Sequence, residues 1–480
     1  MSDFINTSNI LNILYNYNPW WQTDKVSEQF NKEMKRFAYF EANNWFLHES
    51  IRREVLLSGA RRTGKTTIMY QSIASLIENG VSSKNILFIS FEHPLFKLCT
   101  IDTILKVYEE NVCSDSEVYY FFDEIQYADD WDIWMKVLYD TKPSLRIMAT
   151  GSASPMLHDK VKSESGLGRW VVVSVPTLSF FEYCELLKLD KPEISTDIKP
   201  TQMYLLSKEE QINIFKKLSF LQPHFIRYLS VGGFPELALS KDDYYAQRIL
   251  REDIVDKAIK RDLPAIYGTR NIADVEKVFL YLCYSSSNII SIDTITKELS
   301  GVTRVTVQKY IEQLESANLI YISEPIDVTG KKILKVKNKI YISDAAIRNA
   351  VLMNDDINNN PEELGMLAET AVFKHIKSFY YNQPCKVGYY RDGDKGKEID
   401  IVVKTNKFTI MIEVKYREKS DIKLTDAIVQ NYDGKTPNLV ITKRSDDFGI
   451  EDYEGKSIYR IPAFAFLYLL GYIEFNNQNK

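Results

Sequence analysis

One short stretch of the sequence, residues 54–77, constrains the fold more than any other. It reads EVLLSGARRTGKTTIMYQSIASLI, which is an apolar strand pattern, a glycine-containing turn and a helical pattern. The turn carries the pattern GxxxxGK[ST], from Gly59 to Thr66. Gly59 and Gly64 permit backbone conformations that a side chain would block, so that successive N–H groups can point at a phosphate. The stretch therefore predicts a phosphate-binding loop between a strand and a helix.

The polar residues of this loop have predicted roles. Lys65 is expected to reach the β- and γ-phosphates of ATP, and the Thr66 hydroxyl is expected to ligate Mg²⁺. The helix that begins here turns its positive dipole end toward the same phosphates. ATP and Mg²⁺ are therefore the expected cofactors. The predicted nucleotide-binding residues are Gly59, Ala60, Arg61, Arg62, Thr63, Gly64, Lys65, Thr66 and Thr67.

Two later strand patterns end in polar residues that suit the same chemistry. The segment EVYYFFDEIQ, residues 117–126, predicts a strand that ends at Asp123 and Glu124. Asp123 would hold Mg²⁺ through its waters, and Glu124 would polarise the attacking water, a catalytic role. The segment LRIMATGSASP, residues 145–155, predicts another strand and places Ser152 where a side chain can sense the γ-phosphate. These residues make the loop part of a candidate ATPase site.

Two further strand patterns complete a five-stranded sheet. They are NILFISFE, residues 85–92, and RWVVVSVP, residues 169–176. Strands that alternate with helices predict an α/β fold with a parallel sheet and a nucleotide at the carboxyl ends of its strands. Arg169 stands directly before the last strand. Two alternatives stay open for this catalytic candidate: contact with a γ-phosphate, in its own subunit or a neighbour's, or an ordinary surface position.

Sequence blocks beyond the loop indicate a family. The blocks are GARRTGKTT, FFDEIQYADDWDIWMKVLYD, ATGSAS, GRW followed by LSFFEY, and GGFPEL. Together they resemble a large prokaryotic family of AAA+-type P-loop ATPases, whose members carry a C-terminal domain of unknown function similar to restriction-endonuclease-like folds. The resemblance runs over most of the chain. It implies that the protein binds and hydrolyses ATP, with Lys65, Thr66, Asp123, Glu124 and Ser152 on motif positions.

Two other segments of this resemblance leave alternatives open. NPWW, Asn18 to Trp21, is similar to a segment ahead of the phosphate loop in some members. Its tryptophans either pack near the nucleotide base or are buried in the core. The turn from Gly233 to Pro235 follows a mostly helical region that begins near Phe180, and it resembles a turn in the helical lid of related ATPases. It either closes on ATP or is a plain corner between helices.

Residues 291–342 have the pattern of a winged helix. Two helical patterns separated by the turn SGVT precede the strand patterns LIYISEP and KKILKVKNKIYIS. In the last of these, Lys335, Lys337 and Lys339 alternate with apolar residues and are expected to share one face, which could lie along a phosphate backbone. A structural or protein-contacting winged helix is the alternative.

The segment EIDIVVKTNKFTIMIEVK, residues 398–415, predicts a β-hairpin that turns between Asn406 and Lys407. On one face of this hairpin Asp400 lies opposite Glu413, with Cβ atoms about 5 Å apart, and Lys415 projects to the same side. The opposite face carries the apolar pairs that support the register, namely Ile399 with Val414, Ile401 with Ile412 and Val403 with Ile410.

Two carboxylates this close destabilise a hairpin unless a cation or a proton lies between them. With Glu369 on the preceding predicted helix, every position of the pattern E…D…ExK is filled. The resemblance to restriction-endonuclease-like folds thus implies a candidate Mg²⁺-dependent nuclease site of Glu369, Asp400, Glu413 and Lys415. The alternative is a set of salt-bridging remnants in a nucleic-acid-binding or interaction module.

The expected organisation is an N-terminal extension (1–50), a P-loop ATPase core (51–180), a helical lid or linker (181–270), a winged helix (271–345) and a restriction-endonuclease-like α/β domain (346–480). The net charge of −5 gives no overall attraction to nucleic acid, so DNA would be contacted through a local basic patch. The first residues, MSDFINTSNI, lack the basic residues of a secretory signal, and the apolar stretch IPAFAFLYLLGYI is too short to span a bilayer. A cytoplasmic protein without a membrane partner is expected.

Three functions stay open at this point. The first is an ATPase that moves the winged helix and the C-terminal domain. The second is a nuclease under ATP control, and the third is a nucleotide-dependent binding switch with little turnover. DNA, a protein partner and a second copy of the chain are the candidate partners besides ATP.

Overall fold

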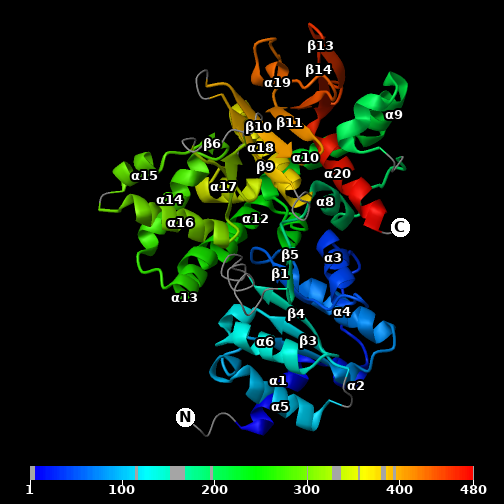
Figure 1. The fold of residues 1–480 in the computed structure, drawn as a ribbon, viewed down its shortest axis with the longest axis vertical. Coiled ribbons are helices and arrows are strands. Elements are labelled where there is room, and N and C mark those ends of the chain that lie inside the picture. Colours follow the sequence, from blue (N-terminus) through cyan, green and yellow to red (C-terminus); the bar gives the residue numbers. More distant parts are fainter. Residues whose placement is uncertain are drawn as a thin grey trace. The chain divides into compact units, whose positions relative to one another are not determined.

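The structure, a computed structural model, describes residues 6–113, 117–151, 168–194, 198–299, 301–326, 337–354, 357–379, 385–392 and 396–478. The chain forms two compact units, residues 1–176 and residues 177–480 (Figure 1). Each unit has its own sheet.

A five-stranded sheet forms the centre of the first unit. Its strand order is β2-β3-β4-β1-β5, and every neighbouring pair is parallel. The five parallel strands expected from the sequence are thus confirmed. The strands are β1 (Glu54–Ser58), β2 (Ile86–Ser90), β3 (Tyr119–Asp123), β4 (Arg146–Gly151) and β5 (Trp170–Ser174). The helices are α1 (Thr7–Tyr17), α2 (Trp20–Thr23), α3 (Phe37–Phe46), α4 (Lys65–Glu78), α5 (Ile101–Asn111) and α6 (Trp131–Thr141), with short 3₁₀ turns η1 (Ser83–Asn85), η2 (Phe96–Leu98) and η3 (Ile125–Tyr127).

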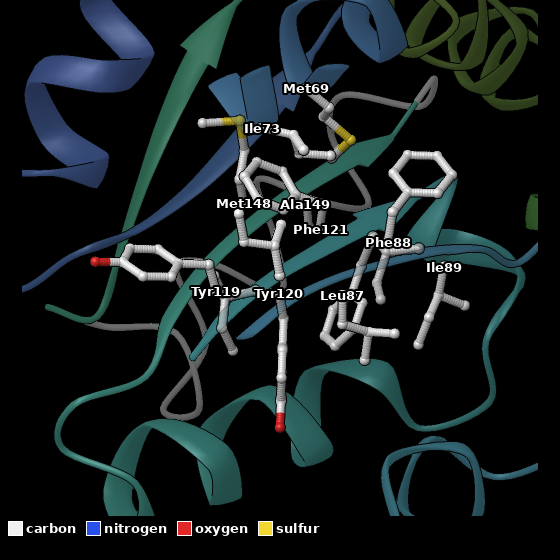
Figure 2. Close-up of a cluster of buried hydrophobic side chains, with 14 of the residues drawn as sticks. Met69, Ile73, Leu87, Phe88, Ile89, Tyr119, Tyr120, Phe121, Met148 and Ala149 are labelled. Carbon is white, nitrogen blue, oxygen red and sulfur yellow. The ribbon is translucent and has the colours of Figure 1, made fainter. Parts of the chain in front are cut away.

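The core of this unit lies on both faces of the sheet. Strands β1, β2 and β3 are buried at every position, because a parallel sheet is covered by its crossover helices. Met69 and Ile73 of α4 belong to the same core as the apolar side chains of β2, β3 and β4 (Figure 2). This packing fixes the strand ends from which the candidate site is built.

The segment Asn18–Trp21 covers the exposed edge of the sheet. The side-chain amide of Asn18 donates to the Phe88 carbonyl at 2.9 Å and accepts from the Phe88 N–H at 2.6 Å. The indole N–H groups of Trp20 and Trp21 both donate to the Ile86 carbonyl, at 3.1 and 2.8 Å. Strand β2 is an edge strand, and these contacts satisfy the Ile86 carbonyl and the Phe88 N–H and carbonyl on its free side. Both tryptophans are buried, which confirms the core alternative for this segment.

The second unit contains a nine-stranded mixed sheet with the order β13-β14-β12-β11-β10-β9-β7-β8-β6. The strands are β6 (Asn288–Ile289), β7 (Ile320–Pro325), β8 (Lys339–Ile342), β9 (Lys386–Arg391), β10 (Glu398–Lys404), β11 (Thr409–Lys415), β12 (Asn438–Thr442), β13 (Gly449–Tyr453) and β14 (Lys456–Pro462). The pairs β6/β8, β7/β8, β9/β10, β10/β11 and β13/β14 are antiparallel, whereas β7/β9, β11/β12 and β12/β14 are parallel.

Helices make up most of the remainder of this unit. The first group is α8 (Phe180–Leu186), η4 (Pro200–Leu205), α9 (Lys208–Leu218), α10 (Leu221–Val231), α11 (Pro235–Ala238) and α12 (Asp243–Ile249), which continues through the π-helical turns η5 (Leu250–Asp256) and η6 (Ala258–Asp262) into α13 (Leu263–Tyr267). The second group is α14 (Ile272–Tyr284), α15 (Ile292–Glu298), α16 (Arg304–Ser316), α17 (Ala345–Leu352), η7 (Ile357–Asn359), α18 (Pro361–Phe379), α19 (Ala427–Gln430) and α20 (Ala463–Gln478).

Helix α20 is apolar around its whole circumference and is buried. A Cβ on Gly471 would lie 2.3 Å from the Cβ of Phe181, so this glycine lets α20 and α8 approach closely. None of the helices in the described ranges combines the length and apolar character that a membrane crossing requires.

A buried ion pair fixes the segment that begins the second unit. The Lys374 ammonium lies 3.0 Å from Oδ2 of Asp344 and donates to the Thr177 hydroxyl at 2.8 Å. The same carboxylate accepts from Thr177 at 2.6 Å and from the N–H of Gly233 at 3.1 Å. Helix α18 and the turn before α17 are thus joined to the turn from Gly233 to Pro235, which forms a corner between α10 and α11. Its closure on ATP stays a prediction.

Candidate functional site

The phosphate loop lies between the end of β1 and the start of α4. Gly64, the residue before α4, has φ of +94°, and only Arg36 Cδ, at 4.0 Å, lies near the position of a Cβ there. Arg62 has φ of +60°. A Cβ on Gly59 would lie 2.1 Å from the Val175 carbonyl oxygen, which follows β5. Both glycines of the pattern are therefore required, one for its backbone conformation and the other for close approach to the neighbouring strand.

Lys65 begins α4 and is buried, with 4% of its surface exposed. Its ammonium donates to the carbonyls of Gly59 and Ala60, each at 2.8 Å. The Thr63 hydroxyl also donates to the Ala60 carbonyl, at 3.0 Å. The loop therefore folds around its own lysine, which places a positive charge inside the turn.

Residues outside the loop contact Thr63 and Arg61. The Arg36 guanidinium donates to the Thr63 carbonyl at 2.6 Å. Arg61 donates to the Tyr127 hydroxyl at 3.0 Å and lies 3.6 Å from Glu92, whereas Arg62 is exposed. Thr67 is half-buried in the first turn of α4. The arginines of the loop thus have different surroundings, and Arg62 is the one that faces solvent.

Asp123, the last residue of β3, accepts two hydroxyl hydrogen bonds. The Thr66 hydroxyl donates to its Oδ1 at 3.0 Å, and the Thr150 hydroxyl donates to the same atom at 2.8 Å. Burial and the negative charge of Glu124 raise the pKa of Asp123 to about 6, against the lowering effect of the two hydroxyls. The carboxylate therefore gains stability from a nearby cation.

Glu124 follows β3 in a left-handed conformation, with φ of +52°. Its N–H donates to the Thr150 hydroxyl oxygen at 2.8 Å, and its carboxylate accepts from the Gln126 side chain. A left-handed non-glycine residue carries backbone strain, which is often found at functional sites. Thr150 of β4 therefore fixes both acids, since it donates to one and accepts from the backbone of the other.

Thr150 has the role that sequence reasoning missed. The sequence showed a strand that ends in polar residues, but it favoured Ser152 as the functional one. The alignment of β3 with β4 was the missing information, because it brings Thr150 to Asp123. Ser152 lies outside the described residues.

The loop and the two acids suit a magnesium–nucleotide complex. Mg²⁺ prefers hard oxygen ligands, and the Thr66 hydroxyl and the Asp123 carboxylate provide them at the carboxyl ends of parallel strands. The nearby Lys65 ammonium and the N-terminus of α4 favour the phosphates. The donor set present here fits both groups.

Arg169 lies at the amino-terminal end of the parallel strands, opposite the end that carries the loop. Trp170, the next residue, pairs with Glu54 at the start of β1, whereas the loop follows Ser58 at the end of that strand. The two ends are about 13 Å apart along a strand of this length. The Arg169 guanidinium instead lies 3.1 Å from Asp140. Within one subunit the structure therefore does not bring Arg169 to the loop, and contact with a neighbour's nucleotide stays a prediction.

The predicted hairpin is formed by β10 and β11. The expected register is confirmed for Ile401 with Ile412 and for Val403 with Ile410. Beyond this point the pairing changes: β10 has a bulge between Ile399 and Val402 relative to β9, and Oδ2 of Asp400 accepts the Val414 N–H at 2.9 Å. A bulge re-aims the side chains of its strand. The Asp400 carboxylate therefore replaces a backbone acceptor where the two strands separate.

A lysine outside the predicted set lies among the acids. The Lys339 ammonium, at the start of β8, is 2.8 Å from Oε1 of Glu369, 2.7 Å from Oε1 of Glu398 and 3.1 Å from Oδ1 of Asp400. The Tyr341 hydroxyl also donates to Glu369, at 2.8 Å. Burial lowers the pKa of Lys339, but the surrounding carboxylates outweigh it and hold that pKa well above the ordinary lysine value.

Glu413 and Lys415 form a second ion pair beside the first. Their oxygen and nitrogen atoms are 2.5 Å apart, and Oε2 of Glu413 is buried without a hydrogen-bond partner. Burial and the charge of Asp400 raise the pKa of Glu413 to about 8, and the same two causes raise the pKa of Glu369 to about 7. The four predicted residues are thus brought together, together with the unpredicted Lys339.

This arrangement does not fit a divalent cation. A lysine ammonium already lies within hydrogen-bonding distance of three carboxylates, including two of the predicted metal ligands. Within the described part of the chain, no group of three or more histidine, cysteine, aspartate or glutamate side chains could hold a metal ion. The structure also corrects the prediction that Lys339 lies on a basic face along a phosphate backbone, since its side chain is 2% exposed. Lys337 is exposed, and Lys335 lies outside the described residues.

Three family models match successive parts of the chain. Residues 52–184 match a model described as an AAA domain. Residues 222–358 match a domain of unknown function (DUF8612), and residues 364–464 match another (DUF4143). The first match and the sheet order together support a P-loop fold of the AAA+ type for the first unit.

Relatives among known proteins cover most of the chain. A protein of Haemophilus influenzae, known only as uncharacterized, is 23% identical over 83% of this chain and 91% of its own length. The uncharacterized protein MJ1544 of Methanocaldococcus jannaschii is 24% identical over 77% of this chain and 79% of its own. The similarity to these bacterial and archaeal proteins therefore extends over most of this chain.

Solved structures with partial similarity come from AAA+ proteins. The ORC1 protein of Aeropyrum pernix, solved in complex with DNA, has 11% identity and a TM-score of 0.31, over 68% of this chain and 94% of that one. The RuvB Holliday junction branch migration motor of Thermotoga maritima has 14% identity and a TM-score of 0.24, over 70% and 97%. Similarity at this level carries no conclusion about how the chain works.

Proposed function

We propose that this protein binds ATP with Mg²⁺ and hydrolyses it at the loop from Gly59 to Thr67. The observation that carries the proposal is the convergence of Lys65, Thr66, Asp123, Glu124 and Thr150 at the carboxyl ends of β1, β3 and β4. The match of residues 52–184 to an AAA domain supports the same function.

Each residue has a defined task in this proposal. Lys65 exchanges its carbonyl partners for the β- and γ-phosphates of ATP. Thr66 and Asp123 are the side chains that would hold Mg²⁺, and the bound ion supplies positive charge beside the phosphate oxygens. Glu124 orients and polarises the attacking water, while Thr150 keeps the backbone of Glu124 and the carboxylate of Asp123 in place. Ser152 remains the candidate for sensing the γ-phosphate.

Replacing Glu124 by Gln tests this mechanism. The amide keeps the shape of the side chain but cannot accept a proton, so ATP affinity is expected to stay within about threefold while phosphate release falls at least about 10²-fold. Glu78→Gln, at the exposed end of α4, is the matched control and should release phosphate at the wild-type rate. Equal turnover by wild type and Glu124→Gln would remove Glu124 from the mechanism. Negligible turnover by the wild type would favour a nucleotide-dependent binding switch.

We infer that ATP binding and hydrolysis by the first unit drive movements of the second unit. The order α14, β6, α15, α16, β7, β8, with β8 paired to both β6 and β7, supports a winged helix. The order α18, β9, β10, β11, α19, β12, with β11 and β12 parallel, supports a restriction-endonuclease-like domain. In this proposal the winged helix and the restriction-endonuclease-like domain move in response to the nucleotide and thereby act on a protein or DNA partner.

Metal-dependent cleavage by the second unit is not part of this proposal, because Lys339 lies among the acids that would have to hold the metal. Cleavage is tested directly by incubating wild type and Asp400→Ala with plasmid and single-stranded DNA, with Mg²⁺ or Mn²⁺ and with each nucleotide. No cleavage is expected from either protein. Cleavage by the wild type that Asp400→Ala abolishes would instead establish an ATP-regulated nuclease.

A further inference from the structure

Lys339 forms a cluster with Glu369, Glu398 and Asp400. A lysine ammonium has three N–H donors and no acceptor. Each of the three carboxylates lies within 3.1 Å of the Lys339 nitrogen, so every donor of this ammonium has a carboxylate partner. A buried charge requires compensating partners. The buried charge of Lys339 is fully compensated by its three carboxylate partners.

The backbone of Lys339 is held from both sides. It pairs with Ser323 of β7 and with Ile289 of β6, so the lysine stem leaves a fixed strand position. Strand β7 in turn pairs with β9, whose Gly388 lies beside Glu324. A Cβ on Gly388 would be 2.1 Å from the Glu324 carbonyl oxygen, which shows how closely the two strands approach. The strands of the proposed winged helix therefore hold the Lys339 ammonium in its position among the acids.

The acids alone have the composition of a divalent-cation site. Glu369, Asp400 and Glu413 come from one helix and two strands, and Asp400 lies at a bulge that separates the strands. A second observation concerns Glu413, which exposes 9% of its surface: its Oε1 pairs with Lys415, whereas its Oε2 is buried without a hydrogen bond. Lys339 pairs with Glu369, Glu398 and Asp400, and Lys415 pairs with Glu413. Two ammonium groups thus face four carboxyl groups.

We propose that Lys339 is a tethered cation that takes the position of a divalent metal ion among these carboxylates. The cluster binds Mn²⁺ or Mg²⁺ only when the Lys339 ammonium is removed or withdrawn, because two cations cannot share the same carboxylate oxygens. In the wild-type protein the lysine joins β8 to α18 and β10. This inference does not depend on ATP hydrolysis by the first unit.

The test is Mn²⁺ binding to the full chain without nucleotide, measured by electron paramagnetic resonance of free Mn²⁺. Lys339→Met is expected to gain one site that binds Mn²⁺ at least tenfold more tightly than any site of the wild type. Addition of Asp400→Asn to Lys339→Met is expected to abolish the gain. Lys337→Met, the exposed neighbour two residues away, and Lys339→Arg, which keeps a cation, are the controls and should gain nothing.

Two results would overturn the proposal. One is Mn²⁺ binding by the wild type that is as tight as in Lys339→Met and is lost in Asp400→Asn. The other is a folded Lys339→Met that gains no site. Where Lys339→Met does not fold, Lys339→Met/Glu369→Gln decides. The tethered-cation role requires that removal of one acid restores a cooperative thermal transition, and a double variant that also fails to fold contradicts it.

Discussion

The hydroxyl of Thr66 donates to Oδ1 of Asp123 at 3.0 Å, across 57 positions of sequence. This contact joins the helix after the phosphate loop to the end of a neighbouring buried strand. It places a hydroxyl and a carboxylate where a magnesium–nucleotide complex needs oxygen ligands.

Thr150→Val tests the residue that the sequence did not single out. Valine has nearly the same shape, but it leaves Asp123 without one donor and the Glu124 N–H without its acceptor. Hydrogen bonds to charged groups contribute about 1.5–3 kcal/mol, so ATP turnover is expected to fall by about ten- to hundredfold. Steady-state phosphate release measures this, with the exposed Thr141→Val as control. Unchanged turnover would exclude Thr150 from the site.

The raised pKa of Asp123 predicts how ATP hydrolysis depends on pH. Since this pKa is about 6, the carboxylate that would hold Mg²⁺ becomes protonated as the pH falls through 6. The ratio kcat/KM, which reports groups of the free enzyme, should fall about tenfold for each pH unit below that value. Circular dichroism at each pH separates loss of activity from unfolding. A flat profile down to pH 5 with folded protein contradicts the assignment of Asp123.

The buried pair of Asp344 and Lys374 predicts a large effect on stability. Lys374→Met leaves an uncompensated buried carboxylate, so the free energy of unfolding should fall by about 3–5 kcal/mol in urea denaturation. The double variant Asp344→Asn/Lys374→Met should lose less free energy of unfolding than the two single variants lose together. Additive losses would show that the two side chains do not stabilise each other.

The same pair predicts a dependence of stability on acid. Burial raises the pKa of Asp344, but the Lys374 charge and the hydrogen bonds outweigh it and lower that pKa below its ordinary value. A lowered pKa in the folded state stabilises the protein above the unfolded pKa of about 3.9, and this stability is lost as the pH falls through the folded value. Asp344→Asn is therefore expected to flatten the decline of stability below about pH 4, as followed by thermal denaturation.

The contact of Asn18 with Phe88 predicts a structural role for the N-terminal segment. Asn18→Ala leaves the Phe88 N–H and carbonyl unpaired at the sheet edge, so the free energy of unfolding should fall by about 1–3 kcal/mol while ATP affinity stays unchanged. Urea denaturation and calorimetry measure the two quantities, and the exposed Asn79→Ala is the control. A tenfold loss of ATP affinity would place this segment at the nucleotide instead.

Local patterns predicted the parts of the fold that depend on near neighbours in sequence. The loop from Gly59 to Thr66 follows a buried strand and begins α4 as expected, because glycine positions and strand periodicity are local signals. The pairing of Ile401 with Ile412 followed from the apolar alternation of the hairpin. These features need no knowledge of distant residues.

The features that could not be predicted depend on contacts between distant segments. The alternation of Lys335, Lys337 and Lys339 suggested one solvent-facing stripe, but Lys339 lies against α18 and β10, which follow it in sequence. The bulge at Asp400 also had no local signal, because it arises from pairing with β9. These distant contacts place a lysine among the C-terminal acids, where the sequence predicts a metal ion.

Binding of ATP at the phosphate loop is most directly tested by titration calorimetry of Lys65→Ala with ATP and Mg²⁺. Lys65 has its ammonium inside the turn, so its removal is expected to weaken ATP binding at least about tenfold, whereas the exposed Lys84→Ala should bind as the wild type does. Circular dichroism of both variants checks that they are folded. ATP affinity that is unchanged in folded Lys65→Ala would contradict nucleotide binding at this loop.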